Sequence, residues 1–313
     1  MGARLGPHAG GRRAEDRWVS GLSAVNPAGR QARRLIAIIG ATGRSGAALA
    51  RRLPAAGVVV RDPAKWAALA LPNPPSIADV TDAPALRRAL AGAIHIISFA
   101  HARHAAAIID AAPPEARLIL LGSTRRFSRW PDSHGDGVRA GEAAFLASHR
   151  AGVMLHPTMI YGAQGEDNVQ RLAALMRRLP MLPLPGGGRA LVQPIHQSDV
   201  TASILAALEH GQGAITIAGP EPLPYSAFCA AVAHAAGLAP RPILPIPAAL
   251  LIAASPLTAL PFLPRIRPAE IRRLTEDKAF AIDTMRAVLG VAPIPLAEGL
   301  RRTFSPSGHA SAS

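Results

Sequence analysis

The sequence of 313 residues predicts an α/β fold, with a doubly wound parallel sheet and a smaller, mostly helical C-terminal lobe. Apolar runs of strand length alternate with helical segments over residues 35–158, which is typical of a parallel sheet. The first run, residues 35–39, is apolar throughout, as expected for a strand covered on both faces. Beyond Tyr161 the alternation gives way to loops rich in glycine and proline, which indicate the second lobe.

Individual segments along the chain have the composition of buried strands or the pattern of helices. We expect strands at residues 35–39, 58–60, 76–80, 93–100, 116–123, 152–158 and 214–218. We expect helices at residues 44–53, 83–90, 101–112, 141–148, 169–179 and 198–210. Prolines support two of these bounds, because Pro54 ends the first helix and Pro84 occupies the first turn of the second.

Composition divides the chain into four segments. Residues 1–34 hold seven arginines against two acids, a balance of +5, and show no apolar periodicity, so we expect a disordered extension. A start codon placed too far upstream and a transit peptide are the alternatives. We expect residues 35–160 to form the sheet domain and residues 161–304 the lobe, with elements at about 190–218 returning to the sheet. Residues 305–313 are expected to be a disordered tail.

The net charge of +14 does not by itself indicate a nucleic-acid-binding protein. Arginine supplies 32 of the 34 basic side chains, since only Lys65 and Lys278 are lysines. The arginines are scattered in pairs, and aromatic residues make up only 4% of the chain, which leaves few rings for stacking on bases. We therefore expect no nucleic-acid partner.

Cysteine and histidine usage argue against two kinds of site. The single cysteine, Cys229, cannot form a disulfide within the chain or a multi-cysteine metal site, so a reducing cytoplasm is the expected compartment. Three histidines come close together at positions 95, 101 and 104, but no carboxylate accompanies them at ligand spacing. We expect no bound metal.

An uncharged apolar segment occupies residues 243–263. Four prolines divide it, and the longest run without proline is too short to cross a bilayer. Membrane contact is therefore not expected. We expect instead a hairpin of short helices that is buried or that faces a protein partner.

A glycine-punctuated turn, GATGRSG, follows the first strand and opens the first helix. Three glycines at this place have separate uses: a tight turn, close backbone approach to a pyrophosphate, and close packing of helix against strand. Free N–H groups at the helix start then face the phosphates. The sequence therefore predicts a Rossmann-type dinucleotide site. Its expected contacts are Gly40, Thr42, Gly43, Arg44, Ser45 and Gly46.

The end of the second strand is where the adenosine ribose is recognised in such folds. The sequence there is VVVRDP, and Arg61 stands at the strand tip. An arginine can pair with a 2′-phosphate in bidentate fashion, so NADP(H) is favoured over NAD(H). Asp62 is the competing residue, because a shift of one position would place its carboxylate on the ribose hydroxyls. A solvated turn without a binding role is the third interpretation.

The sequence resembles the short-chain dehydrogenase/reductase superfamily, in its extended and atypical, epimerase/dehydratase-like branches. The resemblance covers residues 35–304 and depends on GATGRSG, VRDP, ADVTD, GST, LHPTMIYG, PIHQSDV and ITIAGPEPLPYSAF, which occur in family order. It implies that Asp79 and Val80 touch the adenine. It also implies that Ser98, Phe99 and Ala100 flank the cofactor ribose, and that Pro157, Thr158 and Met159 lie near the nicotinamide.

The resemblance further implies hydride transfer assisted by a hydroxyl residue, a tyrosine and a lysine four positions later. Thr124, with Ser123 beside it, matches the hydroxyl position. The only tyrosines are Tyr161 and Tyr225, and neither has lysine at the fourth position after it. Counting back from LHPT places the expected pair near His134 and residue 138, which is a valine. His134 is thus a candidate substitute acid, with a loop histidine of no catalytic role as the alternative.

Two functions remain open from the sequence. One is an oxidoreductase or epimerase-like enzyme that acts on a small molecule. The other is a non-catalytic NADP(H)-binding sensor or assembly subunit, whose partner is a protein. In the family that the sequence resembles, members acting on nucleotide sugars carry an arginine for the diphosphate near the position of Val192, which weakens a nucleotide-sugar substrate, although Arg189, three residues earlier, could compensate. The substrate, the direction of hydride transfer and the oligomeric state are not determined by the sequence.

Overall fold

The computed structural model describes residues 35–130, 132–162, 168–255 and 268–305. The expected extension at residues 1–34, nearly all of the expected tail and the part of the apolar segment beyond residue 255 lie outside these ranges.

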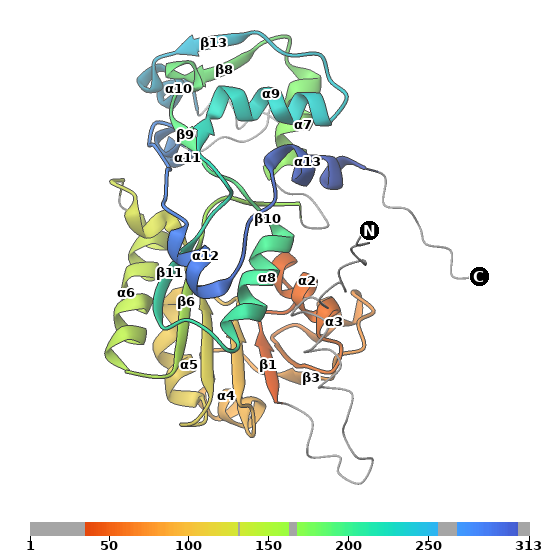
Figure 1. Cartoon of the computed structure of the whole chain (residues 1–313), viewed down its shortest axis with the longest axis vertical. Coiled ribbons are helices and arrows are strands. Elements are labelled where there is room, and N and C mark those ends of the chain that lie inside the picture. The colour runs from red at the N-terminus through yellow and green to blue at the C-terminus, as the bar shows by residue number, and fades with distance from the viewer. Residues whose placement is uncertain (1–34, 131, 163–167, 256–267, 306–313) are drawn as a thin grey trace, which may run out of the picture.

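A seven-stranded parallel sheet forms the larger part of the molecule (Figure 1), and it confirms the predicted fold class. Its order is β11-β6-β5-β4-β1-β2-β3. The chain therefore starts in the middle of the sheet, runs to one edge, returns past β1 to β4 and then runs to the other edge. The carboxyl ends of β1 and β4 meet where this order reverses, which is the place for a ligand in sheets of this kind. The strands are β1 (Ile36–Ile39), β2 (Gly57–Val60), β3 (Pro75–Ile77), β4 (His95–Ser98), β5 (Arg117–Leu121), β6 (Gly152–Pro157) and β11 (Gly213–Ile217).

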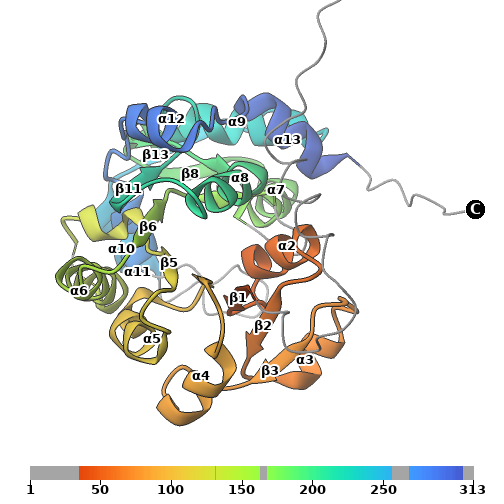
Figure 2. The same ribbon diagram turned by 60° about the horizontal axis from the view of Figure 1, so that its bottom comes forward.

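Helices cover both faces of the sheet (Figure 2). Alternate residues of each strand face opposite layers, so Ile36 and Ile38 belong to one apolar core and Ala37 and Ile39 to the other. The first core is closed by α2 (Arg44–Arg52), α8 (Gln197–Ala207) and α12 (Asp283–Leu289). The second is closed by α4 (Ala83–Leu90), α5 (Ala105–Ala111) and α6 (Ser133–Ala147).

Helix α6 begins at Ser133, eight residues earlier than the sequence predicted. Asp132 caps it by accepting a hydrogen bond from the backbone N–H of Gly135 at 2.6 Å. Gly141, the predicted helix start, lies inside the helix, where an added Cβ would be 2.0 Å from the carbonyl oxygen of Ala102. This glycine allows α6 to approach the short 3₁₀ helix η1 (Ala102–His104), so its reason is tertiary packing rather than helix initiation.

The C-terminal lobe packs its own apolar core between helices and short ladders of two strands (Figure 1). Its helices are α7 (Asn168–Arg178), α9 (Tyr225–Ala235), α10 (Ala248–Ala254), α11 (Pro268–Arg273) and α13 (Leu296–Phe304). Its strands are β7 (Ile160–Tyr161), β8 (Leu182–Pro185), β9 (Leu191–Val192), β10 (Ile195–His196), β12 (Leu223–Pro224) and β13 (Ile243–Ile246).

The apolar segment differs from the expected helical hairpin. Its first part is strand β13, which pairs in parallel with β8, and only α10 is helical among its described residues. Leu244 and Leu250 are exposed, so this part is not buried as one of the two expectations required. Within the described ranges, no helix has the length and apolar character that a membrane span needs.

Candidate functional site

The glycine turn joins β1 to α2 with the geometry that a pyrophosphate site requires. Gly40 has φ +78°, a left-handed conformation that favours glycine, and its carbonyl accepts the N–H of Gly43 at 3.1 Å. An added Cβ on Gly46 would lie 2.5 Å from the carbonyl oxygen of Gly40, so the third glycine allows close helix–strand packing. Gly43 is the N-cap of α2 and offers no side-chain partner to the first N–H groups, which are thus available to an anion.

A cavity of about 360 Å³ opens over this turn at the carboxyl ends of the strands. It brings together most of the glycine turn with Phe99 from the end of β4 and Pro157 from the end of β6. These are residues that the sequence assigned to one cofactor site, although they are up to 117 positions apart. The full lining is Gly40, Gly43, Arg44, Ser45, Gly46, Phe99, Leu121, Gly122, Pro157, Ile160 and Val200.

Hydrogen bonds fix several polar groups around this cavity. Ser45 donates its hydroxyl to the side-chain oxygen of Gln197 on α8 at 2.7 Å, which ties the start of α2 to the neighbouring helix on the same face of the sheet. Ser98 accepts the N–H of Ala100 at 3.2 Å and shapes the loop after β4. Thr158 is buried, and its hydroxyl has no hydrogen-bond partner among the described residues. The free N–H groups at the start of α2, the close packing at Gly46 and the buried hydroxyl of Thr158 fit a dinucleotide cofactor.

Arg61 and Asp62, the two candidates for recognising the cofactor ribose at the end of β2, have different environments in the structure. The Arg61 side chain is 81% exposed and makes one long ion pair, 3.8 Å, with Asp79. Asp62 is the N-cap of α3 (Pro63–Ala67), a helix the sequence reading did not anticipate, and accepts the N–H of Lys65 at 3.0 Å. Asp79 accepts both the N–H and the hydroxyl of Thr81, and these hydrogen bonds lower the pKa of its carboxyl group.

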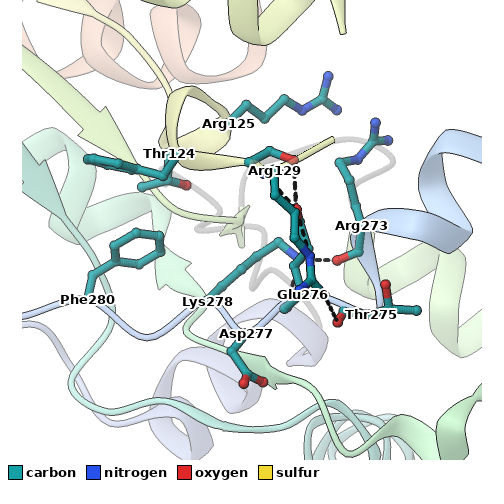
Figure 3. Close-up of a pocket in the computed structure, with 11 residues that line it drawn as sticks. Thr124, Arg125, Arg129, Arg273, Thr275, Glu276, Asp277, Lys278 and Phe280 are labelled. Atoms are coloured by element: carbon teal, nitrogen blue, oxygen red, sulfur yellow. Dashed lines mark hydrogen bonds and ion pairs between the residues drawn. The ribbon is translucent and has the colours of Figure 1, made fainter. Parts of the chain in front are cut away.

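A second cavity, of about 340 Å³, lies between the sheet domain and the segment after α11 (Figure 3). Thr124, at the start of the 3₁₀ helix η2 (Thr124–Phe127), belongs to its wall. The Thr124 hydroxyl donates to the carbonyl of Pro157 at 3.3 Å, and Pro157 lines the first cavity. One hydrogen bond therefore joins the wall of the glycine-turn cavity to that of the second cavity. The full lining is Thr124, Arg125, Phe127, Ser128, Arg129, Arg273, Thr275, Glu276, Asp277, Lys278 and Phe280.

Ser123 and Thr124 are held by a buried ionic network that the sequence reading missed. The Ser123 N–H donates to Nδ1 of His156 at 3.1 Å, and Nε2 of His156 lies 2.8 Å from Oε2 of Glu142. Nε of Arg126 lies 2.5 Å from the same carboxylate oxygen. Burial lowers the pKa of His156 to about 4, so its ring is neutral and carries its proton on Nε2, toward Glu142. Burial raises the pKa of Glu142.

His134 lies in the first turn of α6, but it is not among the residues that line either cavity. Its ring meets the His101 ring edge-on, with 4.3 Å between centroids. Burial, Arg125 and His101 lower the pKa of His134 to about 4, so it holds no imidazolium proton to donate at neutral pH. Val138, one turn later, is buried in the core beneath α6.

The two tyrosines are likewise absent from both cavity linings. Tyr161 is 1% exposed, packs edge-on against the His196 ring and would meet any Cβ added to Gly299. Burial raises the pKa of Tyr161 and of Tyr225. His196 caps α8 by accepting the N–H of Ser198 at 3.2 Å.

Lys278 is a lining residue that the sequence reading did not single out. It stands on the wall of the second cavity, and burial is the main cause that lowers its pKa. The available signal was compositional, since only one other lysine occurs beside 32 arginines.

No family model matches this chain, and no curated protein matches it either. Solved structures match over most of its length. One is an NADPH-dependent quinone oxidoreductase of Escherichia coli in complex with NADPH, with 21% identity, TM-score 0.66, and coverage of 86% of this chain and 99% of that one. Another is a UDP-glucose 4-epimerase of Thermotoga maritima with UDP-glucose, with 14% identity, TM-score 0.64, and coverage of 86% and 97%.

A third is a dTDP-glucose 4,6-dehydratase of Bacillus anthracis in complex with NAD, with 12% identity, TM-score 0.65, and coverage of 86% and 94%. The chain has the fold of the NAD(P)-binding epimerases and oxidoreductases. At these identities the likeness establishes this fold, and it confirms the resemblance predicted from the sequence motifs at that level. Within the described ranges of this NAD(P)-type fold, no three His, Cys, Asp or Glu residues gather as metal ligands would.

Proposed function

We propose that this chain is an NADP(H)-dependent oxidoreductase that acts on a small carbonyl or alcohol substrate. The observation that carries the proposal is the hydrogen bond between Thr124 and Pro157, which joins the wall of the dinucleotide cavity to that of a second cavity of substrate size. Solved structures of the same fold hold NADPH or NAD. A bound nicotinamide would supply the hydride.

Residues that line or support the second cavity can hold and orient a substrate there. A threonine hydroxyl can both donate and accept, so Thr124 can turn from the Pro157 carbonyl to the substrate oxygen and orient it. Ser123 fixes the backbone of this segment, because its N–H is held by the neutral ring of His156. Phe127 and Phe280, with ring centroids 5.6 Å apart, provide an apolar wall of the same cavity.

The different roles of Arg61 and Asp62 at the end of β2 favour NADP(H) over NAD(H). Asp62 uses its carboxylate to cap α3, whereas Arg61 is exposed and has only one distant ion-pair partner in the described chain. An exposed guanidinium is suited to a 2′-phosphate, and a carboxylate engaged in a helix cap is poorly placed for a ribose diol.

Fluorescence titration with NADPH and NADH tests this cofactor assignment. We expect tighter binding of NADPH, and we expect Arg61→Asp to weaken NADPH binding at least tenfold while NADH binding changes little. Arg88→Asp on α4 is the matched control, because it makes the same charge change at another exposed arginine. An Arg61→Asp protein that still prefers NADPH would contradict the assignment.

Turnover is tested by following NADPH oxidation with quinones, aldehydes and keto sugars. We expect reduction of at least one class, and a loss of about 10²-fold or more in kcat for Thr124→Ala with NADPH affinity unchanged. A nucleotide sugar is disfavoured as substrate, since Val192, at the position expected for a diphosphate arginine, is an apolar core residue.

A non-catalytic NADP(H)-binding protein that acts through a protein partner is the second candidate. The geometry of α6 favours it, because Val138 is buried and His134 lines neither cavity. Tight NADPH binding without turnover of any of the three substrate classes would support this candidate over the oxidoreductase. A reducing cytoplasm suits both, as the single cysteine is buried.

A further inference from the structure

Lys278 lies on a segment that is fixed from several sides. Its N–H donates to the carbonyl of Leu191 at 2.9 Å, and the neighbouring Asp277 accepts the N–H of Leu191 at 2.8 Å. Leu191 of β9 is therefore hydrogen-bonded to the segment after α11 through both its N–H and its carbonyl group. This attachment holds Lys278 on the wall of the cavity that contains Thr124.

The ammonium group of Lys278 has two backbone carbonyls as its hydrogen-bond partners among the described residues. Nζ donates to the carbonyl of Arg273 and lies 3.5 Å from the carbonyl oxygen of Glu276. An ammonium carries three hydrogens, so these two carbonyls leave a third. In the view of Figure 3, the Lys278 side chain extends toward Arg273, whose carbonyl its Nζ contacts, and Thr124 and Phe280 lie on its other side.

The charges around Lys278 come from three elements. Arg273 of α11 and Arg125 of η2 repel the ammonium, and together with burial they lower its pKa. Glu276 and Asp277, on the same segment as Lys278, act in the opposite direction.

Both acids are already engaged with other donors. The Glu276 carboxylate accepts the hydroxyl of Ser128 and the N–H of Arg129, whose guanidinium lies 3.8 Å away, and Asp277 accepts the N–H of Leu191. Figure 3 shows the contact between Arg129 and Glu276. The lysine therefore sits in a setting that favours release of a proton.

The other titratable candidates in the described chain are poorly placed for proton donation. His134 is neutral at pH 7 and lines neither cavity. Tyr161 is buried and Tyr225 is half-buried, neither lines a cavity, and burial raises the pKa of the Cys229 thiol to about 12. The arginines of the second cavity do not release protons in proteins.

We propose that Lys278 is the proton donor to the substrate oxygen in the reduction, a role that rests on the oxidoreductase function proposed above. When bound, NADPH would supply a hydride to the carbonyl carbon of the substrate and be oxidised to NADP⁺. The carbon–oxygen π electrons would move to the oxygen, which would take a proton from the Lys278 ammonium to give the alcohol, and the neutral amine would regain a proton from water. Thr124 orients the same oxygen.

The ionisation of Lys278 is measurable on the unmodified protein. Because the chain has two lysines, biosynthetic labelling with lysine carrying ¹³C at Cε gives two NMR signals, which Lys278→Arg and Lys65→Arg assign. Lys65 is the internal reference, since its side chain is 74% exposed. We expect Lys278 to titrate at a lower pH than Lys65. Titration of both at the same pH would overturn the proposal.

Kinetics of the two arginine variants supply the second measurement. Arginine keeps the positive charge and can still donate to the carbonyls of Arg273 and Glu276, but it cannot release a proton. We expect Lys278→Arg to lower kcat about 10²-fold or more, with NADPH affinity within twofold of the unmodified protein and with the alkaline limb of the pH–kcat profile displaced or lost. Lys65→Arg is the matched control, with unchanged kcat.

The outcomes separate this proposal from the one on which it rests. Unchanged kcat in Lys278→Arg, in a protein that oxidises NADPH with a carbonyl substrate, would overturn the role of Lys278 alone. NADPH binding without turnover in the unmodified protein would overturn the oxidoreductase function, and the proton-donor role with it. A Lys278→Arg protein that fails to bind NADPH would be misfolded, and the NMR titration of the unmodified protein then decides.

Discussion

Glu142 is the most sensitive test of how the Ser123–Thr124 segment is held. Its carboxylate is 7% exposed and lies 2.5 Å from Nε of Arg126 and 2.8 Å from Nε2 of His156. Glu142→Ala would leave the Arg126 charge and the His156 N–H without this partner. Breaking a buried pair by removing one member costs about 3–5 kcal/mol. Glu142→Gln keeps the shape and an acceptor for His156, so we expect it to cost about 1–2 kcal/mol.

Urea unfolding measures both free-energy changes, and thermal unfolding should follow them. At about 2–4 °C per kcal/mol for a chain of this size class, Glu142→Ala should lower Tm by roughly 6–20 °C. Glu209→Gln is the control, because Glu209 is 55% exposed and its ion pair with His210 is long, 3.7 Å, so we expect a change within about 0.5 kcal/mol. A Glu142→Ala protein within about 1 kcal/mol of the unmodified one would refute the argument that this buried network holds the segment.

Two further predictions concern α6. Gly141→Ala would place a Cβ 2.0 Å from the carbonyl oxygen of Ala102, so we expect destabilisation of about 1–3 kcal/mol by urea unfolding, and a value near zero would show that α6 can move away. The pKa of His134 is lowered to about 4 in the folded chain from 6.5, so between these values the unfolded chain binds more protons and stability falls as the pH is lowered. His134→Gln should make that fall shallower, as measured by unfolding at several pH values, and an unaltered slope would contradict this burial of the ring.

The strands could be predicted because the burial of a strand leaves a short apolar run in the local sequence. Each of the seven expected strands is present, with ends within three residues of those predicted. The central strands β1 and β2 are covered on both faces and are therefore apolar or glycine along their whole length, whereas β3, at the edge of the sheet, is partly exposed. The glycine turn was recognisable for a similar reason. Gly46 packs against the backbone of Gly40 and Ala41, and Gly40 itself takes a left-handed φ of +78° in the turn, so both requirements leave a spacing in the sequence.

The start of α6 and the role of Asp62 show where local pattern misleads. Gly141 resembled a helix boundary, yet it is required by the carbonyl of Ala102, a residue 39 positions earlier. The sequence favoured Arg61 and left Asp62 as the competing residue, and only the presence of α3 commits the Asp62 carboxylate to a cap. In both cases the deciding contact is made with an element, η1 or α3, whose position the local sequence pattern does not predict.

By itself the sequence determined the parallel sheet and the glycine turn after its first strand, because apolar runs and glycine spacing leave a local pattern, whereas the strand order and the place where it reverses came only from the tertiary structure. Tertiary structure alone brought Glu142 and His156 together and placed Lys278 on the cavity of Thr124, 154 positions away. The physical reason is that burial and charge proximity, which set the pKa of these groups, depend on distances that only the folded chain creates.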